Sequence, residues 1–398
     1  MILSVKLGRS TPRLAHKFNP SSPRTLSTTL IQHHENSLTK NESKPPKIIF
    51  SGIQPTGVPH LGNYLGALKQ WKDMQDTAHH SDRLFFSIVD LHALTIPGNA
   101  DKLRKNRREM LTSLLAIGLN PERSTIFYQS SVSQHAELQW ILSCTASTGY
   151  LSRMTQWKSK LSQSSPFQSD QPTISSPALK HGLFSYPILQ AADILLHTAT
   201  HVPVGSDQKQ HLEFARECVT NFHSAWSIPS SRPIFPYPQT ISLDSSSRIM
   251  SLADPTKKMS KSDPNPKSKI FINDNEGVIR QKIKSALTDS VSKVVGEYDS
   301  VNRPGVANLL EILGGFSGRT GREVAEEIKG ESLLGLKTLT ADTVVDGLAE
   351  VRERFMLFGQ DTEVNRQRVR EIEDIGTRNA RESAERTMEK VRRAIGLS

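Results

Sequence analysis

The stretch Lys47-Ile-Ile-Phe50-Ser-Gly-Ile-Gln54-Pro-Thr-Gly-Val-Pro-His60-Leu-Gly-Asn63 decides the fold class. Its first apolar residues predict a short buried strand, and the helical period over residues 61–74 predicts a helix directly after the turn. Glycines let a backbone approach a ligand closely, and a helix N-terminus favours phosphate. Taken alone, however, a His and a Gly at a helix start more often mark a structural turn than a ligand site.

Further strands and helices alternate along the chain after this unit. Apolar runs predict strands at residues 84–89, 125–129 and 201–204, and helical periods predict helices at residues 103–118, 186–197 and 208–221. Alternation of this kind predicts a doubly wound, Rossmann-like α/β fold, with a parallel sheet covered by helices on both faces. Ligands bind such sheets at the carboxyl ends of the strands, so the turns that follow the strands are the first candidates for a site.

The chain divides into a leader and two folded regions. We expect residues 1–45 to be an organelle transit peptide, because the first 34 residues are basic, rich in Ser and Thr, and free of acidic residues. A disordered basic tail has a similar composition. Residues 46–272 hold the predicted sheet and include a Ser/Pro-rich loop at 162–177 and a mobile loop at 255–262. Residues 273–398 are predicted to be helical, and their last part, 366–393, fits a solvated ion-paired helix face and an RNA-binding face equally well.

Composition narrows the classes of protein that remain. Of the ten net positive charges, six lie in residues 1–47, so charge alone does not establish RNA binding. The two cysteines, Cys144 and Cys218, rule out a disulfide framework and make a cysteine-rich zinc site very unfavourable. No apolar run approaches the length that spans a bilayer, so we expect no membrane partner.

A second motif, Pro255-Thr-Lys-Lys258-Met-Ser-Lys261-Ser262, follows the predicted sheet. Two lysines three residues apart, among small residues, form a cationic loop that can close over a triphosphate and neutralise its charge during attack on the α-phosphate. A basic surface loop is the simpler interpretation. Two observations disfavour the surface-loop interpretation. A five-residue match to Lys-Met-Ser-Lys-Ser arises by chance in roughly 1 in 10⁴ chains of this length, and the first motif precedes the second in the same chain.

Together the two motifs resemble the nucleotide-binding signatures of class I aminoacyl-tRNA synthetases. The first signature usually reads His-Ile-Gly-His, and the variant His60-Leu-Gly-Asn63 points to the tryptophanyl/tyrosyl subclass, in whose tryptophan branch Asn is common at the last position. Other stretches are similar to the tryptophan branch and collinear with it from about residue 47 to the C-terminus: Phe50-Ser-Gly-Ile-Gln54-Pro, Ile88-Val-Asp90-Leu-His92-Ala, Arg153-Met-Thr-Gln156-Trp-Lys158, Tyr186-Pro-Ile-Leu-Gln190-Ala-Ala-Asp193-Ile-Leu, Val202-Pro-Val-Gly205-Ser-Asp207-Gln208-Lys-Gln-His211, Arg248-Ile-Met250 and Pro304-Gly-Val-Ala-Asn-Leu-Leu.

The resemblance implies a reaction and its partners. A member of this branch activates L-tryptophan with ATP, releases pyrophosphate, and transfers tryptophan to the 3′-terminal adenosine of tRNA(Trp). Mg²⁺ is expected to ride on the ATP phosphates without a protein ligand cage. The resemblance further implies a homodimer in which residues 273–398 bind the tRNA anticodon. Combined with the leader, it implies a mitochondrial-matrix enzyme.

The resemblance also assigns roles to individual residues. Gln190 departs from the Met often found at that place in bacterial members. The residues expected to contact tryptophan are Phe50, Gln54, His92, Tyr186, Gln190, Asp193 and Gln208. Those expected to contact ATP are Gln54, His60, Gly62, Asn63, Gly205, Asp207, Gln208, Ile249, Lys258, Met259, Ser260, Lys261 and Ser262. The expected catalytic residues are His60, Asn63, Lys158, Lys258 and Lys261.

The resemblance implies that Asp193 accepts a hydrogen bond from the indole N–H of the substrate. Indole offers one hydrogen-bond donor and no acceptor, so a carboxylate is a suitable partner. Residues 186–196 are otherwise apolar apart from Tyr186 and Gln190. We therefore expect the substrate, rather than another side chain, to be the partner of Asp193. The alternative is a structural carboxylate with a local partner.

Three other functions compete with this one. A tyrosyl-tRNA synthetase is the nearest, and the stretches around Asp193 and Gln208 argue against it. A non-catalytic RNA-binding relative would be favoured by degraded nucleotide motifs, but both signatures are complete. A cofactor adenylyltransferase shares the first motif, and the long helical C-terminal region disfavours it.

Overall fold

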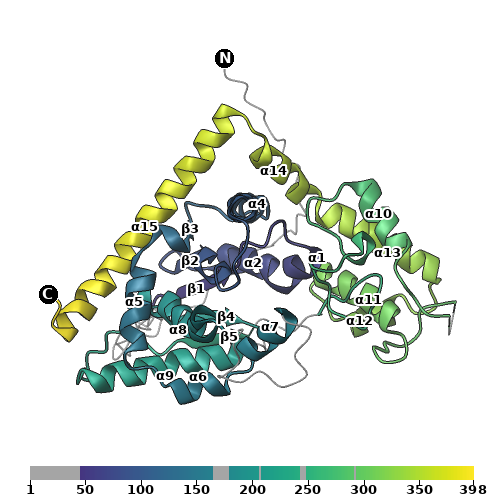
Figure 1. The fold of residues 1–398 in the computed structure, drawn as a ribbon. Helices are drawn as coiled ribbons and strands as arrows, with labels where there is room; N and C mark the ends of the chain where they lie inside the picture. The colour runs from purple at the N-terminus through teal and green to yellow at the C-terminus, as the bar shows by residue number, and fades with distance from the viewer. Residues whose placement is uncertain (1–44, 165–178, 206–207, 243–247, 291–292) are drawn as a thin grey trace, which may run out of the picture. The chain divides into compact units, whose positions relative to one another are not determined.

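A parallel sheet of five strands lies at the centre of the fold (Figure 1). The computed structural model describes residues 45–164, 179–205, 208–242, 248–290 and 293–398, so the predicted leader and most of the predicted 162–177 loop lie outside the described residues. The strand order is β3-β2-β1-β4-β5, and each pair of neighbours is parallel. The strands are β1 (Ile48–Ile53), β2 (Arg83–Ile88), β3 (Ser124–Tyr128), β4 (His201–Val204) and β5 (Gln239–Ser242).

The predicted fold class is confirmed, and the first four strands lie where the apolar runs predicted them. β5 was not predicted, because Gln239-Thr-Ile-Ser contains a single large apolar residue and sits at the edge of the sheet. The predicted 162–177 loop also begins later than expected, since α7 (Gln156–Ser164) continues into it. The helix predicted at 186–197 begins earlier, as α8 (His181–Leu196), with Pro187 inside it.

Helices cover both faces of the sheet, and alternation along the strands decides which side chains face which layer. Phe50, Phe85 and Phe127 point toward one core, formed with α8, α5 (Gln134–Ser143) and α9 (Lys209–Ala225). Leu84 and Phe86 point toward the other core. There they meet α4 (Ala100–Ala116) and the helix that contains α1 (Leu61–Asn63), a π-helical turn at Tyr64–Leu68, and α2 (Lys69–Thr77).

The described residues after Asn273 are helical apart from loops and one isolated bridge, as the loss of strand signals predicted. The helices are α10 (Glu276–Lys284), α11 (Pro304–Ser317), α12 (Gly321–Glu327), α13 (Leu333–Gly347), α14 (Ala349–Gly359) and α15 (Glu363–Ile395). None of the helices in the described part of the chain is long and apolar enough to cross a membrane. The boundary at residues 272/273 stays a prediction.

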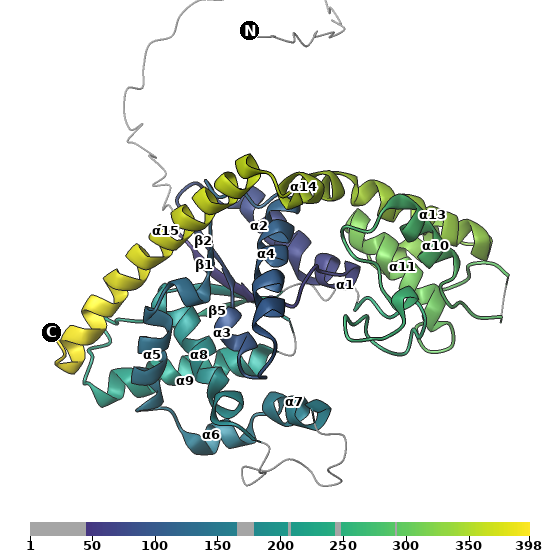
Figure 2. The same cartoon turned by 45° about the horizontal axis from the view of Figure 1, so that its top comes forward.

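The last helix, α15, packs along β3 and α5, where Figures 1 and 2 both show it in yellow. Gly376 permits this approach, because a Cβ there would lie 1.8 Å from the carbonyl oxygen of Ile126. Ala380, Ala384 and Met388 are buried in the same core as Phe127. The Arg/Glu-rich stretch is therefore not only a solvated or RNA-binding face: one side of it is part of the core.

Candidate active site

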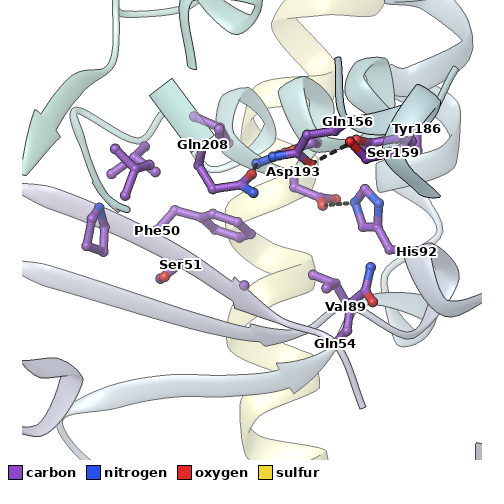
Figure 3. Close-up of a pocket in the computed structure, with 16 residues that line it drawn as sticks. Phe50, Ser51, Gln54, Val89, His92, Gln156, Ser159, Tyr186, Asp193 and Gln208 are labelled. Carbon is purple, nitrogen blue, oxygen red and sulfur yellow. Dashed lines mark hydrogen bonds and ion pairs between the residues drawn. The ribbon is translucent and has the colours of Figure 1, made fainter. Parts of the chain in front are cut away.

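A cavity of about 580 Å³ opens at the carboxyl ends of β1, β2 and β4. Figure 3 shows its lining, and all seven residues expected to contact tryptophan are part of it. The lining combines apolar and polar side chains. The lining residues are Phe50, Ser51, Gly52, Gln54, Val89, His92, Gln156, Ser159, Tyr186, Gln190, Asp193, Ile194, Val202, Pro203, Val204 and Gln208.

Asp193 lies in the wall of this cavity and is 1% exposed. Its Oδ1 is 2.7 Å from Gln129 Nε2 and 2.7 Å from His135 Nδ1. Its Oδ2 is 2.9 Å from the same Gln129 nitrogen and 3.0 Å from His92 Nε2. Burial by itself raises the pKa of Asp193, but hydrogen bonds from His135 and His92 outweigh burial and hold this pKa well below its usual range. The carboxylate is therefore a buried, ionised acceptor.

These contacts correct one expectation. We expected Asp193 to lack side-chain partners, yet three side chains surround it. The reason is that His92 and Gln129 are 101 and 64 residues away in the sequence and reach Asp193 only because β2, β3 and α8 meet at one edge of the sheet. The apolar run around Asp193 correctly predicted the helix that contains it, but it carried no information about the strands and helices that pack against that helix.

A chain of hydrogen bonds runs along the polar part of the lining and includes residues of α8, the helix that also carries Asp193. Gln190 Nε2 donates to Gln208 Oε1 at 3.1 Å, and Gln190 Oε1 is 2.6 Å from His211 Nδ1. Since this oxygen can only accept, His211 Nδ1 is the donor in this contact. Tyr186 Oη is 3.3 Å from His211 Nε2 and donates to Gln156 Oε1 at 3.0 Å. Gln190 is thus satisfied by polar partners on both sides.

The turn that precedes α1 places His60 and Asn63 together. His60 caps the helix: its Nδ1 accepts from the backbone N–H of Asn63, while the Asn63 Oδ1 accepts from the backbone N–H of His60, both at 3.2 Å. Gly62 lies so close to the His60 ring that an added Cβ would be 3.1 Å from it. Burial, followed by the nearby charges of Lys261, Lys258 and Lys269, lowers the pKa of His60 to about 4. His60 is therefore neutral and lies close to a cluster of positive charges.

The loop at 255–262 docks against this turn. Ile249 and Met259 are buried, and the Met259 N–H donates to the Ile249 carbonyl at 3.1 Å. Lys261 Nζ donates to Thr56 Oγ1 at 2.9 Å and to the Gly57 carbonyl at 2.8 Å. Burial lowers the pKa of Lys261 to about 8. Lys258 is exposed, and the hydroxyls of Ser260 and Ser262 are 2.9 Å apart. Two motifs some 200 residues apart thus form one cationic, donor-rich wall.

The family model described as class I tRNA synthetases (W and Y), where W and Y denote tryptophan and tyrosine, matches residues 42–342. The chain belongs to this family. Tryptophan–tRNA ligase, mitochondrial, of Schizosaccharomyces pombe is 44% identical over 89% of this chain and 96% of its own length. The protein of the same name from Saccharomyces cerevisiae is 39% identical over 94% of this chain and 97% of its own.

Solved structures of tryptophanyl-tRNA synthetases share the fold of this class I synthetase. The Mycoplasma pneumoniae structure has a TM-score of 0.72 and 31% identity, covering 89% of this chain and 99% of its own. The Campylobacter jejuni structure complexed with ADP and tryptophan has a TM-score of 0.68 and 31% identity, covering 88% of this chain and all of its own.

Two of the residues expected in this synthetase's site are not placed with the others. Lys158 does not line the cavity: its Nζ lies 5.5 Å from the centroid of the Trp157 ring, whereas its neighbours Gln156 and Ser159 do line it. Asp207 lies outside the described residues. Gly205 is placed, and its carbonyl accepts from the Gln208 N–H at 3.0 Å.

Sequence reasoning missed three side chains of the site. Gln129 and His135 hold Asp193, and His211 holds Gln190 and Tyr186. Gln129 directly follows β3, but the apolar run placed it inside the predicted strand at 125–129, so the rule that sites follow the strands did not single it out. His211 stood inside a stretch quoted for the resemblance without being assigned a role. For His135, at the start of α5, no signal in the sequence stood out.

Proposed function

We propose that this chain is a tryptophan–tRNA ligase that acts in mitochondria. The observation that carries the proposal is the buried, ionised Asp193 in the wall of a cavity that apolar side chains, Phe50 and Val89 among them, also line. Indole needs such a combination, because it is a flat apolar ring with a single N–H donor. The names of the two fungal relatives support the same activity and the same compartment.

The reaction follows from two parts of the site: the cavity around Asp193, and the cationic surface that the His60–Asn63 turn and the 255–262 loop form. The tryptophan carboxylate attacks the α-phosphorus of ATP in line, the bond to the bridging oxygen breaks, and pyrophosphate leaves while tryptophanyl-adenylate remains. Positioning and charge neutralisation are sufficient for this step, so the protein supplies no nucleophile. A hydroxyl of the 3′-terminal adenosine of tRNA(Trp) then attacks the activated carbonyl and releases AMP.

The residues divide between the two substrates. Phe50, Gln54, His92, Tyr186, Gln190, Asp193 and Gln208 bind tryptophan, and the polar chain through Gln190 and His211 holds the groups that meet its ammonium and carboxylate. The His60–Asn63 turn and the 255–262 loop hold ATP, with Gly205 and Asp207 at the ribose. Lys258 and Lys261 neutralise the triphosphate, and Lys158 is a third lysine assigned to it by the family resemblance. Mg²⁺ enters on the phosphates as part of that substrate.

The remaining assignments rest on the family. Residues 1–45 form a transit peptide to the mitochondrial matrix, residues 46–272 form the catalytic domain, and residues 273–398 bind the tRNA anticodon in a homodimer. The complex of the Campylobacter jejuni relative with ADP and tryptophan supports a nucleotide and an amino-acid site in one chain.

Amino-acid-dependent ATP–pyrophosphate exchange tests the activity. Purified protein, assayed with each of the twenty amino acids in turn, is expected to exchange with tryptophan alone. Exchange driven by tyrosine, or by none of the twenty, would show that the proposed function is wrong.

The leader is tested separately from the activity. Residues 1–45 fused to a fluorescent reporter are expected to bring it into mitochondria, since acid-free basic segments of this kind serve as import signals. The reporter alone is the control. A fusion that stays in the cytosol would contradict the proposed location and leave the proposed activity untouched.

A further inference from the structure

Gln129 lies behind Asp193, at the end of β3, and is fully buried. Its Oε1 accepts from the backbone N–H of Leu91 at 3.0 Å, and its Nε2 donates to both oxygens of Asp193, at 2.7 and 2.9 Å. The Leu91 N–H can only donate, so the amide of Gln129 has one satisfactory orientation. With that orientation its N–H groups always face the carboxylate.

The donors to Asp193 fall into two groups by their position. Gln129 and His135 do not line the cavity and are both fully buried, whereas His92 lines it together with Asp193 (Figure 3). A carboxylate oxygen accepts about two hydrogen bonds. Oδ1 therefore has both of its neighbours behind it: Gln129, which donates a hydrogen bond, and His135, whose Nδ1 lies 2.7 Å away in an ion-pair contact. Oδ2 is shared between Gln129 behind and His92 on the cavity side.

We propose that Gln129 is a positioning residue for amino-acid selection, which holds Asp193 so that Oδ2 faces the cavity, and that His92 occupies the place of the indole N–H until the substrate arrives. The inference rests on the proposed function and deepens it. In the empty site His92 Nε2 supplies the donor on the cavity side at 3.0 Å, so the buried charge is paired throughout. When tryptophan binds, its indole N–H replaces the N–H of His92 as the donor to Oδ2 on the cavity side.

With this arrangement, a ligand must carry an N–H at the position of the indole nitrogen in order to bind well. A ligand without the N–H separates His92 from Oδ2 and returns no donor, so this charged oxygen stays buried with Gln129 as its one remaining donor in the structure. Sites built to hydrogen-bond a substrate N–H reject analogues that lack it by large factors. Selection of tryptophan requires the Asp193 carboxylate to stay in place when its contact with His92 is lost. Gln129 and His135 hold it there.

A structural role for Gln129 is the alternative, since the same amide joins β3 to the backbone beside His92. Gln75 provides a matched control. It is also a buried glutamine, it accepts from the Asn120 N–H at 2.7 Å, and its carbonyl accepts from Ser124 Oγ, at the opposite end of β3 from Asp193. Gln129→Met and Gln75→Met remove the same amide from comparable surroundings, but only the first removes donors to Asp193.

The readout is the ratio of kcat/KM in ATP–pyrophosphate exchange for tryptophan and for its benzothiophene analogue, which carries sulfur in place of N–H. We expect the full-length wild type to favour tryptophan strongly, Gln129→Met to lower this ratio by roughly 10-fold or more, and Gln75→Met to leave it within about twofold even if both variants melt earlier. A Gln129→Met ratio equal to that of Gln75→Met would overturn the proposal.

A second variant serves if Gln129→Met does not fold. Gln129→Glu keeps the shape and the acceptor for Leu91, and two adjacent carboxyls share one proton. The protonated form can donate to Asp193 as the amide does, so KM for tryptophan is expected near the wild-type value at pH 6 and roughly 10-fold or more above it at pH 9. The wild type is the reference at each pH, because it carries the same titratable neighbours: His92, His135, Asp193 and the Asp90–Arg107 ion pair. A constant ratio of variant to wild-type KM across this range would refute the positioning role.

Failure of this inference differs from failure of the proposed function. If the wild type does not exchange with tryptophan, the function is wrong. If it exchanges with tryptophan and discriminates against the analogue, but Gln129→Met keeps the ratio of Gln75→Met or the KM of Gln129→Glu stays in constant ratio to that of the wild type across pH, the function stands and the role of Gln129 is wrong.

Discussion

Replacing Asp193 by Ala is expected to destabilise the fold as well as to impair tryptophan selection. Truncation at Cβ leaves Gln129, His135 and His92 without their acceptor, and all three are buried. Removing one partner from a buried charged network costs about 3–5 kcal/mol. Residues 46–398 form one compact unit of about 350 residues, whose unfolding entropy is roughly 0.7 kcal/mol per kelvin. The expected fall in Tm is therefore about 4–7 °C.

Calorimetry of the full-length protein, with Asp193→Asn beside Asp193→Ala, measures this effect. Asn keeps the volume of Asp and one carbonyl acceptor, so we expect its Tm to fall by about half as much. An Asp193→Ala variant that melts within about 1 °C of the wild type would refute the reasoning, because it would mean that the three side chains do not depend on the carboxylate. The same variant is expected to lose kcat/KM for tryptophan by roughly 10- to 1,000-fold.

Two further predictions concern charges elsewhere in the site. Lys258→Ala or Lys261→Ala is expected to lower the rate of adenylate formation in rapid-quench experiments by roughly 10²-fold, with little change in Kd for tryptophan, because the lysines neutralise the leaving pyrophosphate; wild-type rates in both variants would contradict this. His197 is fully buried against Phe50 and Phe85, and within the described residues neither of its ring nitrogens has a hydrogen-bond partner. Burial lowers the pKa of His197 well below 6.5, so the folded chain binds fewer protons than the unfolded chain and loses stability as pH falls below about 6.5. Measured Tm against pH is expected to fall less steeply on the acid side in His197→Phe; parallel acid limbs in variant and wild type would argue against a neutral buried His197.

Much of the fold and part of the site could be predicted because they depend on contiguous residues. Residues 47–63 specify a strand, a turn and a helix through apolar period, glycine placement and helix capping, all of which act within a few residues. The Lys-Met-Ser-Lys-Ser loop likewise has its chemistry in adjacent side chains. The stretches that contain Phe50, His92, Tyr186 and Asp193 were recognisable one by one, and these residues line one cavity.

What the sequence determined by itself was the order of elements, the sign of the charges and the type of chemistry each turn can perform. Only the tertiary structure decided which distant side chains meet, because hydrogen bonds depend on distances that strand order and helix packing set. Gln129 and His92 reach Asp193 across 64 and 101 residues, and no local period encodes such a pairing. For the same reason the docking of α15 on β3 was not predicted: it depends on Gly376 meeting the Ile126 carbonyl from 250 residues further along the chain. Local patterns specify helices and strands. A buried charge, by contrast, is stabilised by whichever donors the fold brings close to it, wherever they lie in the sequence.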